Sequence, residues 1–261
     1  MNEVSFSGWT AGDVSAPAHS FSAAKLLQIW ERGQNQLHAE KALTLLAAAH
    51  PEDPRETLGT LSIGRRDASL ISLREELFGS HFSSLTDCPA CGERLELNFN
   101  ARDIRTSTPA TTAPLCLNQS GYELQLRLPN SLDVLRLADC SNHAEMRANL
   151  FAHCVVRVTH EGRDETSESL PEEIVALAIA RIAEADPQAD VEVDLTCPDC
   201  GHAWQTSFDI VSYLWSELHA WSMELLREVH LLASSYGWRE SDILTMTAQR
   251  RQCYLELLAD E

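Results

Sequence analysis

The chain has 261 residues, long enough to bury a substantial core in one large domain or two modest ones. Its formal net charge of −19 at pH 7 argues against nucleic-acid binding, because such binding depends on a basic surface that displaces counterions from phosphates. No run of about 18 apolar residues is present and the N-terminus lacks the features of a signal peptide, so we predict a cytoplasmic protein without a membrane partner.

The N-terminal region divides into an arm and a helical part. Residues 1–20 are small and polar, which predicts a flexible arm. In residues 21–84, apolar side chains recur at steps of three and four, as on one face of a helix. Gly33 and Gly79 are placed to end helices, and Asp67 is a suitable N-cap for the third helix. The three predicted helices cover residues 22–33, 36–50 and 67–78.

A Cys-Pro-x-Cys-Gly motif occurs twice, at residues 88–92 and 197–201. The similarity continues to Phe99 and Phe208, which both lie eleven residues after the first Cys of their copy. Each motif is typical of a tight turn that holds two thiolates together, and four sulfurs complete the tetrahedral coordination of Zn²⁺. The residues after each turn alternate as short β-strands do. We therefore predict a split zinc ribbon, residues 85–104 and 195–208, in which a structural Zn²⁺ is bound by Cys88, Cys91, Cys197 and Cys200.

Other interpretations of the cysteines are weaker. A redox Cys-x-x-Cys opens a helix in a βαβ unit, whereas both copies here lead into Gly and then into strand-like sequence. Two unconnected knuckles or disulfides remain an alternative. His202 is a possible substitute ligand, although an exposed turn residue is the simpler interpretation. The remaining cysteines have no metal-ligand spacing and are interpreted as reduced, buried side chains: Cys116, Cys140, Cys154 and Cys253.

An insertion of mixed character, residues 105–194, separates the two motifs. Apolar residues alternate from Tyr122 to Leu128, which predicts a hairpin with one buried face. Ser131 or Asp133 is the expected N-cap of a short helix. The further predicted elements of this α+β unit are strands at residues 115–117 and 155–159 and helices at 142–154 and 171–185.

The C-terminal part, residues 209–261, is predicted to be helical. Apolar residues between 211 and 236 follow at steps of four and three, which predicts one long helix that Gly237 ends, and a last helix starts near Ser241. This part is rich in aromatic residues, which are enriched where protein surfaces meet, and its Arg pair could contact an acidic partner. The ordinary alternatives are that the aromatic residues pack in the core and that the arginines pair within the chain. The predicted partner-binding residues are Trp215, Trp221, Tyr236, Trp238, Arg250, Arg251 and Tyr254.

The predicted fold is therefore α+β and mainly helical, with a split Cys₄ zinc ribbon joining the N- and C-terminal helical parts. No set of residues indicates catalysis: the sequence has no Gly-rich phosphate loop, no Gly-x-Ser-x-Gly elbow and no His-Glu-x-x-His. His153 and Cys154 are adjacent, but neighbours on a helix point in different directions, whereas a nucleophile and its base must meet. We predict a protein that is not an enzyme and has no small-molecule substrate.

Several segments carry a resemblance to a known family: residues 30–33, 63–68 and 73–79, the two cysteine motifs, and a C-terminal run within 208–255. On these residues the chain resembles the T-even-type phage baseplate hub assembly chaperone family, whose members also occur in contractile injection systems derived from phage tails. The resemblance implies a protein that binds hub or spike subunits during baseplate assembly. A structural subunit retained in the assembled particle is the alternative, and a zinc-ribbon nucleic-acid module is a less favoured one.

Overall fold

The structure is a computed structural model that describes residues 21–106, 114–138, 140 and 142–259. The predicted N-terminal arm, residues 1–20, lies outside the described residues. Within the described part of the chain, no helix is long and apolar enough to cross a membrane.

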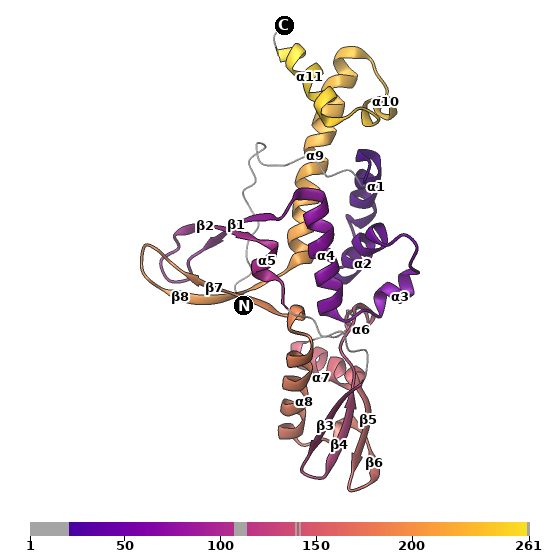
Figure 1. The fold of residues 1–261 in the computed structure, drawn as a ribbon, viewed down its shortest axis with the longest axis vertical. Helices are drawn as coiled ribbons and strands as arrows, with labels where there is room; N and C mark the ends of the chain where they lie inside the picture. Colours follow the sequence, from indigo (N-terminus) through magenta and orange to yellow (C-terminus); the bar gives the residue numbers. More distant parts are fainter. Residues whose placement is uncertain (1–20, 107–113, 139, 141, 260–261) are drawn as a thin grey trace.

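A helical body is built around one long helix. Helices from the N-terminal part pack along this helix, and the main hydrophobic core lies between them (Figure 1). The first two helices and the long helix confirm the apolar periodicity in the sequence. The elements of the body are α1 (Ala23–Gly33), α2 (His38–Ala49), α3 (Arg55–Gly59), α4 (Ile63–Phe78) and α9 (Ile210–Tyr236).

The start of α4 differs from the prediction. The helix begins at Ile63, and its N-cap is Ser62, whose hydroxyl accepts a hydrogen bond from the Arg65 N–H at 3.3 Å. The predicted cap, Asp67, lies inside the helix and accepts a hydrogen bond from the Arg66 side chain at 2.7 Å. Asp67 was the wrong choice because Ser62, five residues earlier, already caps the free N–H groups at the true start of the helix.

Two β-hairpins project from the body and form an arm (Figure 1). Each hairpin is a separate antiparallel sheet of two strands. The strands predicted after the cysteine turns are confirmed. Each of them pairs with a strand before the turn that was not predicted. The strands are β1 (His81–Asp87), β2 (Arg94–Asn100), β7 (Val191–Thr196) and β8 (Ala203–Phe208).

The insertion forms a second unit with a small core of its own, at the end of the molecule opposite the C-terminus (Figure 1). Its four strands form an antiparallel sheet in the order β3-β4-β5-β6, and α8 packs on β3 and β4. The N-cap of α6 is Asn130, and neither predicted cap, Ser131 or Asp133, has that role. The elements of the insertion are β3 (Leu115–Gln119), β4 (Tyr122–Leu126), α6 (Ser131–Arg136), α7 (His143–Cys154), β5 (Val155–His160), β6 (Arg163–Glu165) and α8 (Glu172–Ala185). The short helix α5 (Ala101–Ile104) follows β2 and packs in the main core.

The end of the chain consists of two helices, whereas one was predicted from about Ser241. Gly237 ends α9 with a left-handed φ of 69°, as expected. Helices α10 (Glu240–Leu244) and α11 (Ala248–Ala259) then fold back onto α9. They are separated because the Thr245 hydroxyl donates to the Asp242 carbonyl at 2.7 Å and the Thr247 hydroxyl accepts from the Arg250 N–H at 3.3 Å, so one threonine ends a helix and the other begins the next.

Candidate metal centre

The two cysteine turns have the same backbone geometry. In the first, the Gly92 N–H donates to the Cys88 carbonyl at 2.8 Å, and the Cys88 N–H donates to the Glu93 carbonyl at 2.8 Å. The second repeats the turn with a bond of 3.0 Å from the Gly201 N–H to the Cys197 carbonyl. Gly92 and Gly201 have φ values of 76° and 70°, which a residue with a Cβ rarely adopts. The sequence repeat is therefore a structural repeat.

These turns bring the four predicted ligands together. All four sulfurs lie within 4.8 Å of one another, and two pairs across the hairpins are closer: Cys88 to Cys200 at 3.7 Å and Cys91 to Cys197 at 3.6 Å. A tetrahedral site with metal–sulfur bonds of about 2.3 Å requires sulfurs roughly 3.8 Å apart, whereas a disulfide requires about 2.05 Å. The arrangement fits a four-coordinate metal ion and does not fit disulfides.

The backbone around the sulfurs favours thiolates at some positions, and the sulfurs compete for protons. Burial opposes ionisation of Cys88, but the N–H groups of Cys91 and Ala90 donate to its sulfur and lower its pKa to about 7. At Cys91 the N–H of Glu93 favours the thiolate, yet burial and the neighbouring thiols outweigh it and raise its pKa to about 12. A cation among the sulfurs would replace their protons, which is the ordinary route to four thiolates in one site.

The cysteine cluster lies at the outer end of the arm, away from the helices. Cys88 and Cys197 are buried with Leu95, and Trp204 packs against this small cluster. His202 stacks on Trp204 with ring centroids 5.9 Å apart. Among the described residues, the group that could hold a metal consists of the four cysteines, so the structure gives His202 no place as a ligand.

The base of the arm is held by aromatic packing. Phe82 of β1 stacks on Phe99 of β2 at 5.2 Å and meets Phe208 of β8 edge-on at 5.8 Å. Tyr213 of α9 packs on Phe82 at 5.1 Å, and its hydroxyl donates to the Ser83 carbonyl at 2.8 Å. These rings belong to the main core. The hairpins are therefore joined to the helices by aromatic contacts and to each other, at their far ends, by the cysteines.

The predicted partner-binding residues occupy different environments. Trp221 has an exposed fraction of 7%, and Arg251 has 4% and an ion pair with Glu228 at 2.6 Å, so both are used inside the chain. The Trp215 ring packs against Gly33, where a Cβ would overlap it, and the Lys41 ammonium lies 5.1 Å from the ring centroid.

The other four predicted residues lie together where α11 packs against the end of α9. Tyr236 and Trp238 stack with centroids 4.5 Å apart, Trp238 meets Tyr254 edge-on at 4.8 Å, and the Arg250 guanidinium lies 5.8 Å from the Tyr254 ring. Their binding role stays a prediction.

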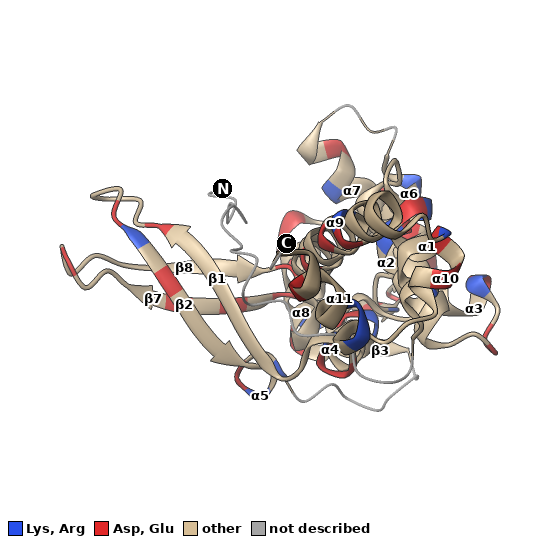
Figure 2. Ribbon diagram, turned by 90° about the horizontal axis from the view of Figure 1, so that it is seen from above, with Lys and Arg blue, Asp and Glu red and all other residues tan. Residues whose placement is uncertain are grey.

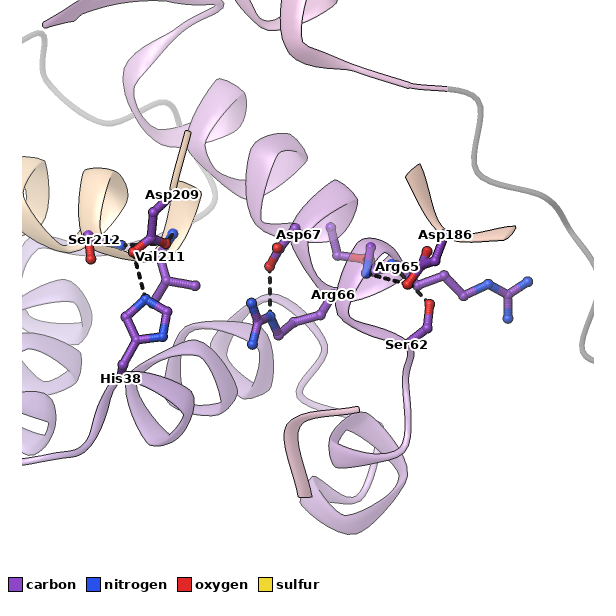
Figure 3. A network of polar contacts seen from close by, with 11 residues as sticks. His38, Ser62, Arg65, Arg66, Asp67, Asp186, Asp209, Val211 and Ser212 are labelled. Atoms are coloured by element: carbon purple, nitrogen blue, oxygen red, sulfur yellow. Dashed lines mark hydrogen bonds and ion pairs between the residues drawn. The ribbon is translucent and has the colours of Figure 1, made fainter. Parts of the chain in front are cut away.

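The sequence reasoning missed a set of polar contacts at the helix starts (Figure 3). The Gly64 N–H at the start of α4 donates to the buried Asp186 carboxylate at 2.9 Å. Asp209 accepts from the Val211 N–H at 3.0 Å and pairs with His38 at 2.8 Å. Asp209 precedes a long apolar periodicity, a signal that would have identified it as an N-cap. Asp186 had no such signal because its partner is 122 residues away.

The adjacent pair His153 and Cys154 does not form a nucleophilic site. Burial raises the pKa of the Cys154 thiol to about 11, which keeps it protonated at neutral pH. His153 faces Asp133 instead, with 4.0 Å between Nδ1 and Oδ1, and Asp133 is already paired with Arg127 at 2.6 Å.

Comparison with known proteins gives one match. Residues 1–215 match the family model described as T4 bacteriophage base plate protein, which covers most of the 261 residues. Comparisons with curated proteins and with solved structures gave no match. The resemblance noted in the sequence is thus confirmed at the level of a T4-type phage baseplate protein, and the chain belongs to the T4 bacteriophage base plate protein family.

Proposed function

We propose that this base plate protein is a non-enzymatic assembly chaperone, which binds hub or spike subunits of a contractile tail, of a phage or of a related injection system, in the cytoplasm before the tail polymerises. The family match over residues 1–215 is the observation that carries the proposal. The shape supports it, because a projecting arm, an insertion and a C-terminal helical hairpin offer separate surfaces around one core (Figure 1). The acidic surface supports it too, since a charge of −19 keeps a chaperone soluble until its partner arrives.

We further propose that the four cysteines bind a structural Zn²⁺. Four thiolates leave no coordination position for water or substrate, and tetrahedral sulfur donors favour zinc over magnesium, calcium or manganese. The ion would fix the two hairpin ends against each other.

Metal analysis of the purified protein tests the zinc proposal. One zinc per chain is expected, and a value well below one after the substitution Cys88→Ser or Cys197→Ser. The substitution Cys253→Ser is the matched control, because Cys253 lies outside the cluster and is exposed. The prediction of buried side chains was wrong for Cys253 and for Cys116, which is also exposed, and right for Cys154. A wild-type protein with no zinc, or equal zinc content in all variants, would refute the site.

Co-expression with hub and spike subunits, followed by pull-down and gel filtration, tests the chaperone proposal. We expect a stable complex with at least one such subunit, and soluble recovery of that subunit should fall when the protein is left out. No co-purifying baseplate subunit would sink the proposal.

A structural subunit is the second candidate, and the description of the matching family as a base plate protein favours it. The two functions differ in the finished particle. A chaperone is expected to be depleted from purified tails, whereas a structural subunit is retained there in a fixed ratio to the hub proteins. Quantitative mass spectrometry of purified particles separates them.

A further inference from the structure

The strands of the arm have unpaired edges. The described residues show two strands in each hairpin sheet, so each strand has one neighbour and one free side. Every second residue of such a strand presents its N–H and C=O away from the neighbour, and these groups can pair with an added strand. The insertion sheet also ends in edge strands, β3 and β6, so a free edge alone does not single out the arm.

One of these edges lines an open groove. The groove has a volume of about 700 Å³ and lies between β2 and the second cysteine turn. Residues 93–97 form one wall, and Thr196, Pro198 and Asp199 form the other. Leu95 and Leu97 share one face of β2, and Glu96 lies on the opposite, exposed face. Glu93 is exposed in the turn that precedes β2.

The groove is acidic. Glu93, Glu96 and Asp199 line it with Arg94, and Arg94 is already paired with Asp87 at 3.2 Å. Within the described residues, no cationic side chain pairs with Glu93 or Asp199. The two hairpins, residues 81–100 and 191–208, contain six acidic residues and one Arg, and Figure 2 shows acidic residues towards the outer end of the arm.

We propose that this groove binds an extended, basic segment of a partner protein as an additional strand along β2. Main-chain hydrogen bonds to a sheet edge supply affinity, and alternate side chains of the added strand supply specificity. Lysine or arginine at alternate positions would place positive charge along this edge, near the carboxylates of Glu93, Glu96 and Asp199 that line the groove. The inference rests on the proposed function only in taking the partner to be a subunit of the baseplate.

A synthetic peptide tests the groove without any baseplate subunit. The probe is a fluorescein-labelled peptide with the repeating sequence Lys-Thr-Lys-Val, and its binding to the full-length, metal-loaded protein is followed by fluorescence anisotropy. The peptide with Glu in place of Lys should not bind. N-methylation of alternate peptide nitrogens should abolish binding, because it removes the strand hydrogen bonds and leaves the charges.

Matched variants locate the binding site. The double substitution Glu93→Lys with Glu96→Lys should weaken peptide binding about tenfold or more. The double substitution Glu192→Lys with Asp194→Lys makes the same change in net charge on β7, outside the groove lining, and should change binding less than about twofold. The absorption of bound Co²⁺ checks that each variant retains the four-sulfur site.

Three results would overturn the inference. Equal weakening in both double variants would mean unspecific attraction to an acidic protein. Unchanged binding of the N-methylated peptide would mean that no strand is added. Absence of any binding by the Lys peptide has the same consequence. The proposed function fails separately, when wild-type protein co-purifies with no baseplate subunit whatever the peptide does.

Discussion

Gly64 lies in the first turn of α4, where there is space for a hydrogen atom and no space for a methyl group. A Cβ at this position would overlap Oδ1 of Asp186 and lie 3.0 Å from the backbone nitrogen of Ala189. Asp186 lies beside Ser62 and Arg65 at the start of α4 (Figure 3), and it accepts a hydrogen bond from the Gly64 N–H at 2.9 Å. This hydrogen bond is one of several contacts between the end of the insertion, residues 186–189, and the start of α4.

The substitution Gly64→Ala should lower the free energy of unfolding by about 1–3 kcal/mol, the usual cost of overpacking. The buried Asp186 carboxylate must move to admit the methyl group, and the nearby backbone of Ala189 leaves it little room to do so. Gly59→Ala is the control, because a Cβ there meets the flexible side chain of Leu132, which can rotate away, and it should cost less. Urea unfolding measures both variants, and equal stability of Gly64→Ala and wild type would contradict the packing described.

A buried ion pair holds the centre of the body. The Arg74 guanidinium donates to both Glu217 oxygens at 2.8 and 2.6 Å, and it also donates to the Gly79 carbonyl at 2.6 Å. Its central carbon lies 4.0 Å from the Phe82 ring centroid. Arg74 thereby connects α4, α9 and the base of the arm. Burial raises the pKa of Glu217 although Arg74 acts to lower it, so the charged carboxylate depends on its partner.

The substitution Arg74→Met should destabilise the protein by about 3–5 kcal/mol at pH 7, because Glu217 is left buried without a cation. The double variant Arg74→Met with Glu217→Leu should recover much of this loss. A carboxyl group whose pKa is raised in the folded state stabilises it below the unfolded pKa of about 4.3 and loses that contribution as pH rises. The deficit of the single variant should therefore shrink as pH falls towards 4, and a deficit independent of pH would argue against a buried charge.

The long helix α9 shows where sequence patterns were sufficient. The apolar steps of three and four predicted its length and end, and Leu218, Leu225 and Leu232 are buried as expected. The first half is also buried on a second face, at Tyr213 and Glu217, because the arm and α4 pack there. The pattern alone could not show this, since the burial of a polar residue such as Glu217 can be predicted only when its partner is known.

The hairpins show where the patterns fell short. In β1 the buried positions include Ser84 and Thr86, so the alternation is in burial and not in hydrophobicity. In β7 the alternation of Val191, Val193 and Leu195 was present in the sequence and was not used. The clustering of the four cysteines was predicted correctly because the two turns have the same sequence and the spacing of a four-sulfur site. Asp186 and Glu217 instead acquire their roles from contacts distant in sequence.

Helix α9 begins at an N-cap that is also part of an ion pair. Asp209 accepts from the Val211 and Ser212 N–H groups at 3.0 and 3.2 Å, and His38 lies 2.8 Å from its other oxygen. Burial acts to raise the pKa of Asp209, but His38 outweighs it through its hydrogen bond and charge, and the pKa falls to about 2. The cap is thus charged throughout the neutral and mildly acidic range.

Asp209→Ala should cost about 1 kcal/mol of stability at pH 7, the usual value of a lost N-cap. A carboxyl group with a lowered pKa stabilises the folded state above its unfolded pKa of about 3.9 and loses this contribution as pH falls through the folded value. The difference between wild type and Asp209→Ala should therefore diminish between pH about 4 and 2. Asp209→Asn keeps the acceptor without the charge and should show little of this pH dependence. Thermal unfolding across this pH range distinguishes the three proteins.

At the scale of the molecule, the cysteine cluster and the main core are separate. The main core runs from α1 to α11 and includes Phe82, Phe99 and Phe208 at the base of the arm. The cysteines and Leu95 form a different, small cluster at its tip. A metal ion there would connect two hairpin ends, while the N- and C-terminal helices are already joined by direct packing along α9.

Removal of the metal should therefore unfold the tip of the arm and leave the helical body intact. With a chelator, amide hydrogen exchange is expected to become fast in residues 84–97 and 193–206, because a closed four-cysteine site contributes on the order of 10 kcal/mol to the folding of small zinc domains and little else holds the tip. Exchange in α4 and α9 and the helical circular dichroism should stay as before, since their contacts lie in the main core. The substitution Cys88→Ser should have the same local effect without chelator, and Cys253→Ser should have none. Loss of helical signal on chelation would instead show that the metal holds the two helical parts together, and that packing along α9 is insufficient without it.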